Sequence, residues 1–145
     1  MTPESIARVR ETWALVAPIA DTAADLFYQR LFALDPRLRL MFGSTDWAAQ
    51  RRKLVHALNL AVASLDRVQE IAPRLEALGS RHAASYGVQD CHYDTVGEAL
   101  IATLKQGLGE AWTAEAAAAW KEAYDIVSGA MRRAPGRVIS GGAAA

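Results

Sequence analysis

The sequence has little of what secreted, membrane-spanning or nucleic-acid-binding proteins need. Its single cysteine, Cys91, cannot form an internal disulfide, which favours a reducing compartment. Sixteen basic and sixteen acidic residues cancel, so no field of one sign indicates a nucleic acid or a membrane surface as partner. No apolar run approaches the roughly 20 residues that span a bilayer. Because Thr2–Ser5 begin no charged-then-apolar leader, we expect a cytoplasmic protein.

Alternating apolar and polar residues, the pattern of half-buried strands, are also missing over any useful length. The 145 residues correspond to about one domain, and 52 % of them are hydrophobic, with helix formers prominent. A chain of this size can bury a core that encloses a small cofactor. The sequence therefore predicts an all-α domain over residues 1–134, followed by a disordered tail over residues 135–145.

Capping residues and apolar stripes at helical spacing predict where the helices begin and end. Thr2 with Pro3 begins the first helix, and Asp35–Pro36 ends the second and begins a short connector. The helix that carries His82 is predicted to begin at Pro73. The other predicted helices cover residues 2–16, 19–34, 36–42, 47–65, 90–108 and a last segment that Thr113 caps.

His82 carries the strongest single indication of function. Leu75, Leu78 and His82 fall at i, i+3 and i+7, so the imidazole lies on the apolar face of a helix. The sequence then changes to Ala84–Gly87, which places the ring at the exposed end of a buried stripe. A neutral imidazole there can ligate a metal or haem iron through one nitrogen while the other donates a hydrogen bond. A lone histidine of this kind is more often a core residue, so the interpretation depends on other segments.

Two polar residues upstream also fall on apolar faces. Gln50 precedes Leu54 by four residues on one helical stripe, and a buried amide needs a partner, which a ligand could supply. Tyr28 lies one turn before Phe32, so its hydroxyl can point inward. Taken alone, each is more often a core residue bonded to the backbone. His56 lies about 200° around the helix from Leu54, so we expect it to face solvent.

Taken in order, five segments resemble a globin: Leu26–Tyr28, Leu40–Phe42, Gln50–Leu54, Leu78–His82 and His92–Leu100. The resemblance covers about residues 2–133 and is closest to bacterial single-domain haemoglobins and the haem domain of flavohaemoglobins. It implies a three-on-three helical sandwich that encloses one haem. No Cys-x-x-Cys-His motif occurs, so the haem is expected to be b type, bound non-covalently at one per chain.

The resemblance also implies roles for single residues around the iron. His82 becomes the proximal ligand of the haem iron. Tyr28 and Gln50 take the distal positions, where they would stabilise a bound gas, and Leu54 forms the apolar wall beside them.

Other residues are implied at the edges of the haem. Phe42 corresponds to the phenylalanine that packs on the haem edge, and Tyr93 to a tyrosine next to the proximal imidazole. Lys53 and Arg81 correspond to positions where cations meet the haem propionates, although both are equally interpreted as solvated charges. The remaining predicted haem contacts are Leu78, Val88 and Val96.

The sequence departs from the family pattern at two places on the proximal side. Tyr93 follows His82 by eleven positions, one more than is usual in the family, which makes the contact between them an open point. Flavohaemoglobins carry a glutamate late in the last helix that polarises the proximal histidine through the tyrosine. The corresponding stretch here, Met131–Gly136, has no acid. We therefore expect a less anionic proximal histidine.

These observations predict a protein that reversibly binds dioxygen, with nitric oxide and carbon monoxide as further ligands. The first alternative is a nitric oxide dioxygenase that depends on a separate reductase, since no flavin or nicotinamide part follows the globin segments. A second alternative is a haem-based gas sensor or haem-handling protein, which would need a partner for its output. A globin-like module without haem is disfavoured, because His82, Tyr28 and Gln50 would then have no use.

Overall fold

This computed structural model describes residues 1–133, apart from the side chains at positions 85, 86 and 90. Six α-helices form the framework of this part of the chain. No strand occurs among these residues, and the all-α prediction is confirmed. The predicted tail over residues 135–145 lies outside the described residues. The helices are α1 (Pro3–Val16), α2 (Ala20–Leu34), α3 (Trp47–Ala63), α4 (Val68–Tyr86), α5 (Asp90–Leu108) and α6 (Ala114–Arg132). Short 3-10 helices connect them at η1 (Ala17–Ile19), η2 (Pro36–Met41), η3 (Leu65–Arg67) and η4 (Gly109–Ala111).

Side-chain caps set the beginnings of three helices where the sequence predicts them. The Thr2 hydroxyl accepts from the Ser5 backbone N–H at 3.1 Å and begins α1. Asp46 accepts from the Ala49 N–H at 3.2 Å before α3. Thr113 caps α6 in the same way, at 3.1 Å. These bonds satisfy backbone donors that a helix cannot satisfy within itself.

Helix α4 corrects one prediction, because it begins at Val68 and contains Pro73 in its interior. Proline favours the first helical position, but Ile71 is buried against Ala130 of α6, and Val68 packs on the same cluster. This burial extends the helix through the proline, despite the lost backbone hydrogen bond. The helix also continues to Tyr86 and ends at Gly87 (φ 69°), so His82 lies one turn inside it.

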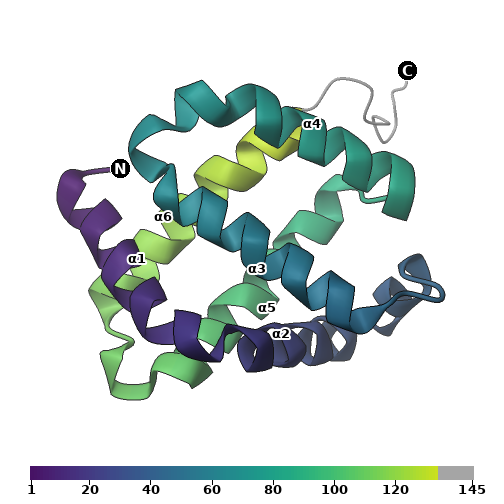
Figure 1. Ribbon diagram of the computed structural model, residues 1–145, viewed down its shortest axis with the longest axis horizontal. Coiled ribbons are helices and arrows are strands. Elements are labelled where there is room, and N and C mark those ends of the chain that lie inside the picture. Colours follow the sequence, from purple (N-terminus) through teal and green to yellow (C-terminus); the bar gives the residue numbers. More distant parts are fainter. Residues whose placement is uncertain (134–145) are drawn as a thin grey trace.

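Two apolar clusters hold the helices together. In the main cluster α1 packs on α6 and α2 on α5, and the rings of Trp13 and Trp120 meet edge to face at 6.3 Å between centroids. In the second cluster α4 packs on α6 through Ile71, Leu75 and Ala130. Figure 1 shows α4 along the edge opposite α2, with α3 crossing between them. Among the described helices, none has the length and apolar character to cross a membrane.

Candidate functional site

The structure brings Tyr28 of α2 and Gln50 of α3 into direct contact. The Gln50 side-chain amide (Nε2) donates to the Tyr28 hydroxyl at 3.1 Å, and the two residues are only 9 % and 7 % exposed. The partner of the buried amide is therefore another side chain. The Tyr28 oxygen accepts this bond through a lone pair, and a phenol is a hydrogen-bond donor as well as an acceptor.

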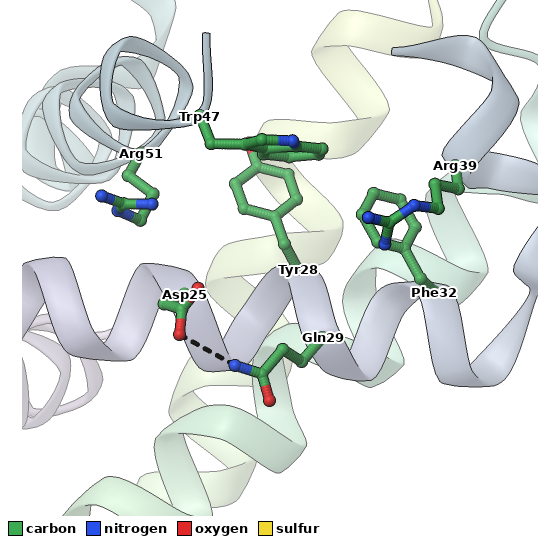
Figure 2. A pocket seen from close by; sticks show the side chains of 7 residues that line it. All are labelled: Asp25, Tyr28, Gln29, Phe32, Arg39, Trp47 and Arg51. Atoms are coloured by element: carbon green, nitrogen blue, oxygen red, sulfur yellow. Dashed lines mark hydrogen bonds between the residues drawn. The ribbon is translucent and has the colours of Figure 1, made fainter. Parts of the chain in front are cut away.

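Aromatic rings from three elements hold the Tyr28 ring in place. Its centroid lies 6.1 Å from that of Phe32, 5.7 Å from Phe42 and 5.3 Å from Trp47. Figure 2 shows the Trp47 indole lying across Tyr28. The sequence analysis missed Trp47, although it lies three residues before Gln50 and so shares its helical face. Together these contacts fix the direction of the Tyr28 hydroxyl.

A cavity of about 380 Å³ opens on the side of Tyr28 that faces Trp47 (Figure 2). Its lining consists of Asp25, Tyr28, Gln29, Phe32, Arg39, Trp47 and Arg51. Neither Gln50 nor His82 is part of this lining. This cavity, which we call the outer cavity, shares Tyr28 with the predicted haem site but none of the other predicted haem contacts, and sequence patterns did not predict it.

His82 lies half-buried on α4, with one further helical turn after it. Burial lowers the pKa of His82 below its ordinary value of 6.5; hydrogen bonding with the backbone of Leu78 opposes this shift, and the charge of Arg81 adds to it. The imidazole is therefore neutral at neutral pH, which is the form that ligates a metal.

Tyr93, predicted beside the proximal imidazole, is buried on α5 under residues of α6. The Arg132 guanidinium carbon lies 5.0 Å from the Tyr93 ring centroid, and its Nη2 donates to Asp94 at 2.9 Å. The Tyr124 hydroxyl donates to the Tyr93 carbonyl at 2.6 Å. Burial raises the pKa of Tyr124 far above its usual range, which keeps this hydroxyl protonated. The carboxyl-terminal end of α6, which has no acidic residue, thus places the Arg132 guanidinium against the Tyr93 ring.

The remaining predicted haem contacts differ in how exposed their side chains are. The apolar ones are all half-buried: Phe42, Leu54, Leu78, Val88 and Val96. The two cations Lys53 and Arg81 are exposed, which fits both interpretations, contact with haem propionates and a solvated charge. His56 is exposed on α3, as predicted. Half-buried apolar side chains leave surface that a flat apolar group would cover.

These residues fit a haem better than a bare metal ion. Within residues 1–133 no three histidine, cysteine or acidic side chains gather as a metal-binding group. A single neutral imidazole suits a haem, because the porphyrin supplies the other nitrogen ligands. Helix α4 packs closely on α6 but makes little backbone contact with α3 or α5 in the part of the chain described. The fit to a haem rests on the neutral His82 imidazole and on the half-buried apolar side chains at the predicted haem contacts.

Comparison with known proteins gives matches along most of the chain. A globin family model matches residues 25–131. The chain is 30 % identical over 130 residues to a flavohemoprotein of Bacillus subtilis (strain 168), covering 88 % of this chain and 32 % of that protein. It is 33 % identical over 109 residues to a flavohemoprotein of Rhizobium meliloti (strain 1021), covering 71 % and 27 %. The chain thus spans about a third of the length of these relatives.

Two solved structures share the arrangement of helices. A hexacoordinated heme protein from an anhydrobiotic tardigrade superposes with a TM-score of 0.83 at 16 % identity, over 92 % of this chain and 94 % of that one. A Pseudomonas aeruginosa PAO1 protein, described as structurally highly homologous to a human hemoglobin, gives 0.78 at 22 % identity, over 88 % and 95 %. With the family match, the conclusion is that this chain belongs to the globin family and has the all-α globin fold.

Proposed function

We propose that this globin holds a haem through His82 and reversibly binds dioxygen beside Tyr28 and Gln50. Membership of the globin family implies the haem. The observation that carries the proposal is the 3.1 Å hydrogen bond between the buried Gln50 and Tyr28 side chains. When bound, the haem supplies the iron at which a diatomic gas coordinates.

The chain contributes a ligand on one side and hydrogen-bond donors on the other. Burial keeps the His82 imidazole neutral, which is the form in which histidine ligates iron. Gln50 and the ring of Trp47 hold Tyr28, whose phenolic proton can be donated to the partial negative charge that dioxygen develops. One such bond in a dry pocket is worth roughly 1–3 kcal/mol. Two donors favour tight binding and slow release.

Nitric oxide dioxygenation with a separate reductase is the alternative, because relatives of this chain are flavohemoproteins. The position of Arg132 favours reversible dioxygen binding over nitric oxide dioxygenation. Its guanidinium against Tyr93 places a positive charge where the acid-free end of α6 meets the proximal side. An arginine only donates hydrogen bonds, so it cannot act as the carboxylate that would make the imidazole more anionic and help oxygen–oxygen cleavage.

Stopped-flow measurement of gas release tests the proposal. Tyr28→Phe removes one hydroxyl and almost no volume, so dioxygen release should become about five- to a hundredfold faster, and carbon monoxide release should change much less. Gln50→Leu should act in the same direction with a smaller effect. Tyr124→Phe is the matched control, because it removes a buried hydroxyl that bonds to the Tyr93 carbonyl. A rate of dioxygen release in Tyr28→Phe within twofold of the wild-type rate would refute the proposal.

Mixing the oxygenated protein with nitric oxide separates the two functions. A reversible binder gives one round of nitrate and then stops. Sustained nitrate production, when a cell extract supplies electrons, would instead make the dioxygenase the better assignment.

A further inference from the structure

The outer cavity has a floor of three aromatic rings. The centroids of Phe32 and Trp47 lie 5.7 Å apart, and those of Tyr28 and Trp47 5.3 Å apart. Its volume of about 380 Å³ lies in the range of small-molecule sites, roughly 300–1,000 Å³. Phe32 and Trp47 are only half-buried, so part of this aromatic surface is left for a ligand to cover.

The charges around this floor are unevenly distributed. Figure 2 shows Arg51 and Arg39 on opposite sides of Trp47, with Asp25 on the side of Arg51. The Arg51 Nε–H donates to Asp21 at 3.0 Å, which offsets its charge, and Asp25 adds a carboxylate to the lining at this end. The Arg39 guanidinium carbon lies 5.4 Å from the Phe32 ring centroid, and within residues 1–133 it forms no ion pair. The Arg39 end of the cavity is therefore its positive end.

We propose that the outer cavity binds a planar aromatic carboxylate of one or two rings. The ring would lie on Trp47 and Phe32, where flat aromatic groups stack favourably. The carboxylate would face Arg39, whose planar guanidinium matches its two oxygens. Asp25 would repel a carboxylate at the opposite end, where Arg51 is paired with Asp21, which gives the ligand one orientation. Tyr28 lines the cavity, but the ligand contacts proposed here are made by Arg39, Trp47 and Phe32, none of which is a predicted haem contact.

Calorimetric titration of the purified full chain with naphthoate tests the site. We expect saturable binding that Arg39→Gln weakens at least about fivefold, through the lost charge-assisted hydrogen bonds. Arg52→Gln is the matched control, because Arg52 is an exposed arginine of α3 outside the cavity lining. It should leave the affinity unchanged. Naphthylmethanol, which has the same rings without charge, should bind as weakly as naphthoate binds to Arg39→Gln.

Nuclear magnetic resonance supplies the second readout. Naphthoate should shift the indole N–H signal of Trp47, identified by its loss in Trp47→Phe, more than those of Trp13 and Trp120 in the core. The proposal is overturned by absence of saturable binding, by equal affinity for naphthoate and naphthylmethanol, or by equal weakening in Arg39→Gln and Arg52→Gln. A Trp47 signal that does not move would also overturn it.

Discussion

Gly79 of α4 lies directly against the backbone of Met131 in α6, and a Cβ at position 79 would overlap the Met131 carbonyl oxygen. The two helices therefore cross at a distance that only glycine permits. Backbone cannot move aside as a flexible side chain can, so Gly79→Ala should lower the free energy of unfolding by about 2 kcal/mol or more. Urea denaturation monitored by circular dichroism measures this change.

Gly107→Ala is the control for that substitution. Gly107 also lies in a helix, but a Cβ there would meet nothing within 4 Å. This variant should gain roughly 0.5–1 kcal/mol, because alanine is the better helix former. Equal stability changes in the two variants would contradict the close crossing of α4 and α6.

Replacing His82 by alanine should give a protein that holds little haem and has an altered Soret band. The physical reason is the loss of the one neutral, half-buried imidazole on α4. His56→Ala is the control, because His56 is exposed on α3 and should be spectroscopically silent. Haem content and the ferrous spectrum of both variants measure the effect. An unchanged spectrum in His82→Ala would show that another residue holds the haem.

Stability of the haem-free protein should depend on the protonation of His82. Burial lowers the pKa of His82 in the folded state below its ordinary 6.5, so the unfolded chain binds a proton more readily. The contribution of His82 to the free energy of unfolding is complete above about pH 6.5, its ordinary pKa. It is lost as the pH falls through the lower pKa of the folded state. His82→Gln should remove this part of the pH dependence, and His56→Gln should retain it. Parallel pH profiles of unfolding for wild type and His82→Gln would refute the prediction.

Arg10 of α1 caps the carboxyl end of α3. Its Nε donates to the Val62 carbonyl at 3.2 Å, and its Nη2 donates to the Ala63 carbonyl at 3.0 Å and to Asp66 at 2.9 Å. A cation at the negative end of a helix dipole adds to these bonds. Arg10→Gln should therefore cost about 1–2 kcal/mol of unfolding free energy.

Arg8 supplies the comparison for Arg10, since it is an exposed arginine on the same helix. Arg8→Gln should change the unfolding free energy by less than about 0.5 kcal/mol. Thermal melts at low and high salt separate the two contributions, because salt screens the ion pair with Asp66 more than the bonds to carbonyls. A similar loss in both variants would mean that Arg10 acts through general surface charge.

Local patterns in the sequence predicted most of the helices, because caps and apolar spacing act within a few residues. Thr2, Asp46 and Thr113 begin helices as expected. Pro73 misled the prediction for α4, since the local preference of proline gave way to the burial of Ile71 on another helix. Tertiary packing of this kind leaves no local trace that a capping rule can detect.

The surroundings of the candidate site could be predicted only in part. The buried Tyr28 and Gln50 follow from helical spacing, but their mutual hydrogen bond joins residues 22 positions apart. The stacking of Arg132 on Tyr93 joins α5 and α6 in the same way. Such contacts depend on how the helices cross, and the spacing of residues along one helix does not predict this. The globin resemblance implied roles for Tyr28 and Gln50. It implied no role for Arg132 and did not predict the outer cavity.

The dependence of α4 on α6 has a consequence during protein synthesis. Helix α4 leaves the ribosome before α5 and α6, yet its main docking surface is on α6, around Ala130 and Met131. Helices α1, α2 and α3 can begin to associate while the chain is still being translated. The helix that carries His82 lacks its main docking surface until α6 has emerged. We therefore expect His82, the proposed haem ligand, to be among the last residues positioned, and haem capture to follow translation of α6.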